Sequence, residues 1–328
     1  MKNLPLMITT SKPNFLLFFA GIGLGILLLV AIGIYSSRRN EINNSRIIFP
    51  GQDTSAYSRN NIPKLPDKLI FAGERVPIEN FEIKERVERE LLVNVYWYSA
   101  TILGIKRANR WFPVIEPILQ KYKVPDDFKY IPVIESNLYN SVSQASAVGF
   151  WQLTEDVAKK YGLEVNDEID ERYSVELSTE AACKYFLEAY NNFKNWTLAA
   201  AAYNMGSNGL ERQIEKQKVK NYYNLLLSEE TSRYVARAIT IKLLFQHPEE
   251  YGYYIKPEEL YSPLTTTTLE VNSPVKNWAD FAISHEINYK VLKYFNPWLR
   301  DISLAIKKGK TYVLKIPVKG SIEMIKDE

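Results

Sequence analysis

The feature that most restricts the fold of this chain is an uncharged run of 22 residues near its N-terminus. Residues 14–35 read NFLLFFAGIGLGILLLVAIGIY. As a helix this run would be about 33 Å long, which is enough to cross the hydrocarbon core of a bilayer. It is too long for the core of a signal peptide, and no small-x-small cleavage site or lipidation cysteine follows closely. We therefore predict a single uncleaved transmembrane anchor, preceded by a short tail over residues 1–13.

The charges around this run do not fix its orientation. Lys2 and Lys12 precede it, but Arg38 and Arg39 follow directly, so the positive-inside rule is close to a tie. Residues 36–67 are polar and turn-prone with few periodic apolar positions, which predicts a linker between the membrane and the rest of the chain.

Composition excludes several classes of function. The 328 residues leave room for one substantial core and a smaller module. The net charge is +3, from 41 basic and 38 acidic residues, and no dense basic block lies outside the N-terminal region, so no nucleic-acid partner is expected. Cys183 is the single cysteine, and His247 and His285 are isolated, so we expect no disulfide, metal site or cofactor.

Helical periodicity dominates residues 68–246, and we predict an all-helical domain there. Residues 82–107 are expected to form one long amphipathic helix, because apolar side chains recur at steps of three and four. These positions are Ile83, Val87, Leu91, Val95, Tyr98, Ile102 and Ile105. Further helices are predicted over residues 112–122, from a cap at Asp126-Asp127 to about Glu135, from a cap at Thr154 to Gly162, and over 178–193, 197–204 and 229–245.

One glutamate is placed to act as an acid. Glu135 follows the apolar run Tyr130-Ile131-Pro132-Val133-Ile134, and Pro132 is unexpected inside a helix. A carboxyl held against apolar side chains loses hydration, which raises its pKa and suits a general acid. A helix-end glutamate that reaches into solvent is the alternative reading.

Four motifs occur in one order along the chain. They are Glu135-Ser136, Gly149-Phe150-Trp151-Gln152, Ala202-Tyr203-Asn204-Met205-Gly206 and Glu230-Thr231-Ser232-Arg233-Tyr234-Val235. Over about residues 71–245 this set resembles the lytic transglycosylases of the lysozyme superfamily, particularly the membrane-bound type-D branch. The resemblance implies a lysozyme-like helical domain that cleaves the β-1,4 link between N-acetylmuramic acid and N-acetylglucosamine in peptidoglycan. It also implies an inner-membrane protein whose catalytic domain lies in the periplasm.

The resemblance implies a mechanism with a single carboxyl. Most glycosidases use two, but helix-capping electrostatics already explain Glu155 and Asp156, the nearest later carboxyls. In the similar enzymes the acid protonates the leaving oxygen, and the N-acetyl carbonyl helps to stabilise the anomeric centre. The resulting carboxylate then takes the proton of the C6 hydroxyl, and a 1,6-anhydro end forms. Glu135 matches this acid and base.

Supporting roles are also implied by the resemblance. Ser136, Ser143, Gln152, Tyr203, Asn204 and Tyr234 match positions near the acid or along the sugar groove. Each has a structural alternative: Ser136 could cap a turn, Tyr203 could pack in the core, and Gln152 could satisfy backbone groups.

The last part of the chain, residues 247–328, is predicted to hold a linker and a small strand–helix–helix–strand unit. The strands are expected over 265–271 and 311–316 and the helices over 275–284 and 289–295. The unit is similar to a LysM peptidoglycan-binding module, although the usual Gly-Asp-Thr opening is missing. Sugar binding and a purely structural role remain equal alternatives for it.

The sequence therefore predicts a membrane-anchored peptidoglycan lytic transglycosylase, mainly α-helical. Two alternatives stay open. One is a muramidase of the same fold in which water attacks, and the other is a peptidoglycan-binding scaffold without catalysis.

Overall fold

The computed structural model describes residues 62–307 and 309–323. The predicted anchor over 14–35, the tail before it and most of the predicted linker lie outside the described residues. Within those residues, no helix is both long enough and apolar enough to cross a bilayer.

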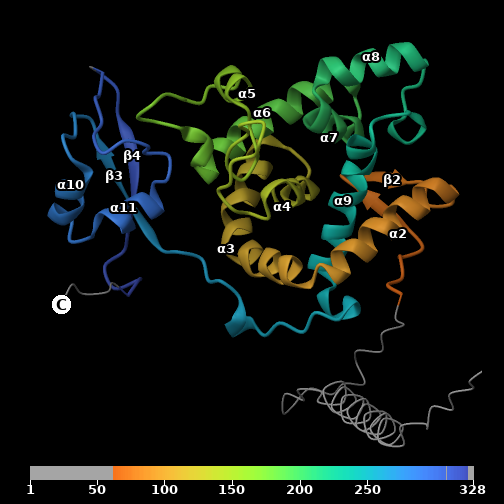
Figure 1. Ribbon diagram of the computed structural model, residues 1–328, viewed down its shortest axis with the longest axis horizontal. Coiled ribbons are helices and arrows are strands. Elements are labelled where there is room, and N and C mark those ends of the chain that lie inside the picture. Colours follow the sequence, from red (N-terminus) through yellow and green to blue (C-terminus); the bar gives the residue numbers. More distant parts are fainter. Residues whose placement is uncertain (1–61, 308, 324–328) are drawn as a thin grey trace, which may run out of the picture. The chain divides into compact units, whose positions relative to one another are not determined.

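The described chain is mainly helical, with two small antiparallel strand pairs (Figure 1). The first part contains β1 (Leu69–Phe71), β2 (Glu74–Val76), α2 (Phe81–Tyr96), α3 (Tyr98–Tyr122), a 3₁₀ turn over Asp126–Tyr130 and α4 (Ile131–Ser136). The middle contains α5 (Glu155–Lys160), α6 (Val175–Phe193), α7 (Trp196–Met205), α8 (Ser207–Gln217) and α9 (Glu229–Gln246). The last part contains β3 (Thr266–Val271), α10 (Trp278–Ser284), α11 (Tyr289–Phe295) and β4 (Tyr312–Pro317).

The prediction of one helix over 82–107 is wrong. α2 ends at Tyr96, Trp97 leaves the helical conformation with φ −83° and ψ 54°, and α3 then continues to Tyr122. The apolar spacing carries on through the break, so periodicity alone could not reveal it.

α3 contains Pro113 and Pro117, which cannot donate backbone hydrogen bonds. The helix continues across both prolines because its buried side packs against neighbouring elements.

The segment before Glu135 also differs from the prediction. Asp126 and Asp127 lie in the first turn of the 3₁₀ helix and do not cap it. Asp127 instead accepts the Ala72 amide at 2.7 Å and pairs with Lys242 at 2.8 Å. α4 begins only at Ile131, so Pro132 lies in its first turn, where a missing amide hydrogen costs nothing.

α7 lies at the centre of the main core. Its four successive alanines, Ala199–Ala202, are fully buried, and their small side chains allow α6 and α9 to approach closely. The start of α7 is held by Asn195, which caps it, and by Glu74, whose carboxylate accepts the amides of Trp196 and Thr197. A carboxylate is favourable there because amides and the helix dipole make the N-terminus positive.

The hairpin that supplies Glu74 was not predicted. β1 and β2 pair from Leu69↔Val76 to Phe71↔Glu74, and the turn between them is Ala72-Gly73 with φ +53° and +80°. Two positive φ values are typical of the tight turns that match strand twist. Ala-Gly is a weaker signal for such a turn than Asn-Gly.

The C-terminal unit has the predicted order of strand, helix, helix and strand. β3 and β4 pair antiparallel from Thr266↔Pro317 to Val271↔Tyr312. Trp278, Leu292 and Leu314 are fully buried in its separate core. We call residues 266–317 the LysM-like unit.

Candidate active site

Glu135 lies in the last turn of α4, next to the end of that helix. α4 stops at Ser136 because Asn137 and Leu138 both adopt left-handed backbone conformations, with φ +52° and +54°. The Glu135 side chain is half-buried, and Oε1 accepts the hydroxyl of Tyr234 at 2.5 Å. Tyr234 comes from α9 and is 1% exposed, so this hydrogen bond joins the two helices inside the protein.

Burial controls the ionisation of Glu135. Loss of hydration raises the pKa of the carboxyl above its ordinary value of 4.5, and the nearby charge of Glu230 acts in the same direction. The hydrogen bond from Tyr234 and the charge of Arg237 oppose the shift because they favour the carboxylate. The net direction is upward, so the group holds its proton to higher pH than a solvated glutamate.

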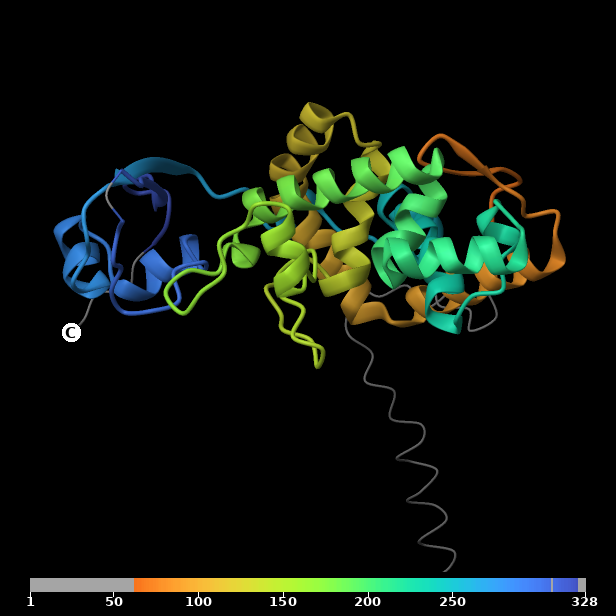
Figure 2. The ribbon, with the colours of Figure 1, turned by 90° about the horizontal axis from the view of Figure 1, so that it is seen from above.

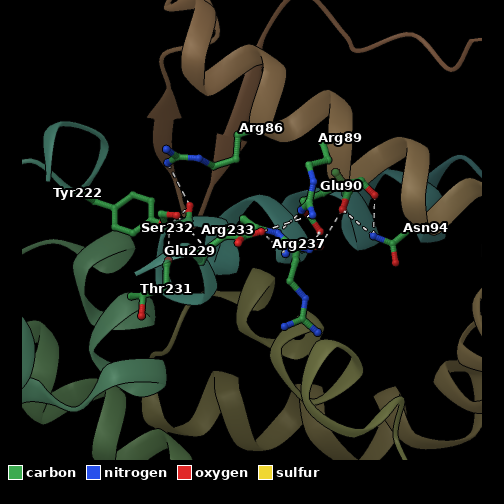
Figure 3. Close-up of polar contacts among 11 residues, drawn as sticks. Arg86, Arg89, Glu90, Asn94, Tyr222, Glu229, Thr231, Ser232, Arg233 and Arg237 are labelled. Carbon is green, nitrogen blue, oxygen red and sulfur yellow. Dashed lines mark hydrogen bonds and ion pairs between the residues drawn. The ribbon is translucent and has the colours of Figure 1, made fainter. Parts of the chain in front are cut away.

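Arg237 is a neighbour that sequence reasoning missed. Its Nη2 donates to the carbonyl of Ile134 at 2.6 Å, directly before Glu135. Figure 3 shows Arg237 directed away from the polar cluster around Glu90. Arg237 follows Tyr234 by three residues on a helix, which is the spacing that places two side chains on one face. That spacing was the available signal.

The cluster around Glu90 fixes α9 against α2 (Figure 3). Glu90 is 2% exposed, and its carboxylate accepts Arg233 Nε at 2.6 Å and Arg89 Nη1 at 2.8 Å. Arg233 also contacts Glu229 at 3.1 Å. A buried carboxylate needs such partners, and the cluster therefore fixes the register of the helix that presents Tyr234 and Arg237.

Ser136 connects α4, the helix that carries Glu135, to the loop 141–153. Its hydroxyl lies 3.1 Å from the carbonyl of Pro132 and 2.9 Å from that of Phe150, and it also accepts the amide of Tyr139. These contacts are all with backbone atoms of the protein.

Ser143 and Gln152 lie within that loop. Ser143 is exposed, and its Oγ accepts the amide of Ala147 at 3.0 Å. Gln152 has a left-handed backbone with φ +50°, and its Nε2 donates to the carbonyls of Ser141 and Gly149 at 3.1 and 2.7 Å. Both side chains therefore hold the loop in shape, and neither is hydrogen-bonded to Glu135.

Tyr203 and Asn204 connect α7 to the same region. The Tyr203 hydroxyl donates to the carbonyl of Trp151 at 2.6 Å. Asn204 accepts the hydroxyl of Thr231 at 2.7 Å and donates to Glu230 at 3.1 Å. Glu230 lies in the fourth motif, but sequence reasoning assigned it no role of its own. It accepts a hydrogen bond from Asn204, and its charge helps to raise the pKa of Glu135.

The structure therefore brings only part of the predicted set together. Tyr234 contacts Glu135 directly, while Ser136 and Tyr203 hold the adjacent backbone of Phe150 and Trp151.

Glu155 is exposed on α5 and paired with Lys159 at 2.5 Å. Among the described residues, no group of three or more His, Cys, Asp or Glu side chains is arranged to hold a metal ion.

A surface hollow of about 550 Å³ lies on the LysM-like unit and not beside Glu135. It is lined in part by Asn272, Asn277, Asp280, Phe281 and His285. Glu135 is the candidate centre because it combines burial, a raised pKa and a direct hydrogen bond to Tyr234.

Two domain families match this chain. Residues 113–226 match the transglycosylase SLT domain, and residues 267–320 match the soluble lytic transglycosylase C-terminal LysM-like domain. The chain thus contains a transglycosylase SLT domain followed by a LysM-like domain.

Two proteins of similar sequence can be compared with this chain. Over 267 residues the chain is 27% identical to membrane-bound lytic murein transglycosylase D of Escherichia coli, a match that covers 79% of this chain and 57% of that protein. It is also 30% identical over 138 residues to a putative tributyltin chloride resistance protein of Alteromonas sp. (42% and 66% coverage). The chain therefore spans little more than half the length of the transglycosylase D that it matches.

A solved structure also shows similarity. An inactive mutant of the lytic transglycosylase Slt from Pseudomonas aeruginosa aligns with a TM-score of 0.34 and 15% identity, covering 47% of this chain and 26% of that one.

Proposed function

We propose that this protein is a peptidoglycan lytic transglycosylase that cleaves the β-1,4 bond between N-acetylmuramic acid and N-acetylglucosamine and leaves a 1,6-anhydro end. The observation that carries this proposal is the half-buried Glu135, with a raised pKa and a direct hydrogen bond to Tyr234, inside the SLT region. The relatives whose names describe lytic murein transglycosylases support the same chemistry.

In the proposed reaction Glu135 acts twice. It first gives its proton to the glycosidic oxygen, so the C–O bond breaks and the N-acetylglucosamine side leaves as an alcohol. The carboxylate formed is stabilised by the Tyr234 hydroxyl and by the charge of Arg237. It then takes the proton of the C6 hydroxyl, whose oxygen bonds to C1 and closes the anhydro ring. No water is consumed, and Glu135 ends protonated again.

The remaining residues are proposed to shape the site around this group. Ser136 and Tyr203 fix the backbone of Phe150 and Trp151 beside it. Asn204 and Ser143 would contact the sugar, and Gln152 keeps the loop folded. We also propose that residues 14–35 anchor the protein in the inner membrane with the catalytic domain in the periplasm, where peptidoglycan lies.

Digestion of purified sacculi by the full chain, followed by mass spectrometry of the products, tests this function. Anhydro ends are expected from the wild type and none from Glu135→Gln. Glu155→Gln makes the same change at an exposed carboxyl and should retain activity.

Two other outcomes would replace the proposal. Reducing ends alone would show a hydrolase, in which water attacks in place of the C6 hydroxyl. Sedimentation of the protein with sacculi without any released fragment would show a binding scaffold.

A further inference from the structure

The LysM-like unit is anchored to the helical domain by the loop between α5 and α6, residues 161–174. Ile169 of this loop is 1% exposed and packs in the core of the LysM-like unit. It also forms an antiparallel bridge with Leu299. In Figure 2 the lime-coloured loop reaches the blue unit. One residue of the helical domain is thus part of the core of the other unit.

Backbone pairing extends this contact on both sides of Ile169. The amide of Asp170 donates to the carbonyl of Trp298 at 2.9 Å, and the amide of Arg300 donates to the carbonyl of Glu168 at 2.8 Å. Residues 168–170 therefore pair with residues 298–300 as a short antiparallel strand, which defines a register between the two segments.

Charged side chains add further contacts between the helical domain and the LysM-like unit. Glu164 accepts Lys310 and the Tyr312 hydroxyl, and Glu176 pairs with Lys315. Burial alone would raise the pKa of Glu164, but the hydrogen bonds from Lys310 and Tyr312 outweigh it and lower that pKa.

The same loop carries a buried ion pair. The guanidinium of Arg172 donates to both carboxylate oxygens of Asp170, at 2.9 and 2.7 Å, and both side chains are about nine-tenths buried. Such a forked pair is held in one geometry because two parallel hydrogen bonds must form together. Asp170 is the residue whose amide bonds to the LysM-like unit.

Arg172 also contacts the loop 141–153. Its Nη1 donates to the carbonyl of Ser146 at 3.2 Å and to that of Leu153 at 3.3 Å. The backbone of Gly149 lies against the Arg172 carbonyl so closely that an added Cβ would stand 2.1 Å from the oxygen. One guanidinium thus holds both ends of the segment that contains Gly149, Phe150 and Gln152.

This segment is in turn hydrogen-bonded to α4, the helix that carries Glu135. The carbonyl of Phe150 accepts the hydroxyl of Ser136, the residue after Glu135. A continuous series of contacts therefore runs from Trp298 through Asp170 and Arg172 to the backbone beside Glu135.

We propose that Arg172 is a positioning residue and that the LysM-like unit supports the loop 141–153 through it. The unit then acts on the proposed reaction from within the molecule, whether or not it binds glycan. This inference deepens the proposed function and depends on it only for its kinetic readout, because loop order can be measured without substrate.

Arg172→Lys in the full chain tests the first part of this proposal, the positioning role of Arg172. Lysine keeps the charge beside Asp170 but lacks the planar fork that reaches the carboxylate and two carbonyls together. Hydrogen–deuterium exchange should rise in peptides over 141–153 and stay unchanged in those over 229–246. On sacculi, kcat should fall about tenfold while KM changes by less than about twofold. The matched control is Arg75→Lys, an exposed arginine paired with Glu79.

Ile169→Ala tests the second half. Its side chain packs in the LysM-like core, so its truncation loosens the joint without touching the loop 141–153. Exchange should again rise over 141–153, with a fall in kcat. The control is Ile283→Ala, because Ile283 is 70% exposed on α10.

The outcomes separate the two proposals. Raised exchange confined to residues 266–317 in Ile169→Ala, with unchanged kcat, overturns support by the LysM-like unit. Unchanged exchange over 141–153 in Arg172→Lys overturns the role of Arg172. If the exchange shifts occur but the wild type releases no anhydro ends, the proposed function fails and the positioning stands.

Discussion

The hydroxyl of Tyr234 donates to the carboxylate of Glu135 across 2.5 Å, although 99 residues separate them in the sequence. Tyr234 is held by α9 and Glu135 by the last turn of α4. The bond favours the charged carboxylate, while burial favours the neutral acid, so the two effects oppose each other at one group.

Removing the tyrosine hydroxyl should move the pH profile of cleavage. In Tyr234→Phe the carboxylate loses a hydrogen bond, so the pKa of Glu135 rises further and the fall of activity at high pH shifts upward. We expect kcat to drop about tenfold at neutral pH, because the carboxylate formed after proton transfer is less stable. The measurement is kcat against pH on sacculi. Tyr254→Phe, at an exposed tyrosine, is the control. A downward shift of that limb would contradict the assigned contact.

The acid should destabilise the fold when it is charged. The folded-state pKa of Glu135 lies above its ordinary value of 4.5, so between these two values the native state binds more protons than the unfolded state. The free energy of unfolding therefore falls as pH rises through this window. Glu135→Gln carries no charge, and its Tm should exceed that of the wild type at pH 7.

This difference should disappear as the pH falls below about 4.5. Glu155→Gln is the opposite case, because the hydrogen bond from Lys159 lowers the pKa of Glu155, and it should gain no stability at pH 7. Thermal unfolding across pH measures both variants. Equal Tm values for Glu135→Gln and wild type at pH 7 would argue against a buried charge.

Gly149 should not tolerate a side chain. Its φ is +83°, and an added Cβ would clash with the Arg172 carbonyl at 2.1 Å. Gly149→Ala should lower the free energy of unfolding by about 3 kcal/mol, from backbone strain plus the shift that the clash forces. In Gly209→Ala the new Cβ meets only ordinary contacts in α8, so that control should be stabilised by about 0.5–1 kcal/mol. Urea unfolding compares the two.

Arg233 should stabilise the fold through its ion pair with the buried Glu90. Arg233→Ala leaves the buried carboxylate with Arg89 alone, and we expect a loss of about 1–3 kcal/mol in unfolding free energy. Arg75→Ala removes an exposed pair and should change it by less than about 0.5 kcal/mol. The double variant Arg233→Ala with Glu90→Gln should lose less than the sum of the single changes, because each removes the same interaction. Strict additivity would show that the pair is not coupled.

The sequence by itself determined most of the secondary structure and singled out the glutamate that we propose as the acid. Steps of three and four in the apolar residues located most of the helices, since a helix in a globular core must bury one face, but α8 was not predicted. The four motifs in order singled out Glu135. The order of strands and helices in the LysM-like unit followed from β-branched runs and short periodic segments.

Only the tertiary structure decided which groups meet. The break at Trp97 left the apolar spacing intact, and two prolines within α3 are tolerated through packing that the sequence does not display. Arg237, Glu230 and the Asp170–Arg172 pair act through contacts with residues distant in sequence. Periodicity reports which face of an element is buried, but the partners of a buried charge depend on how separate elements pack together.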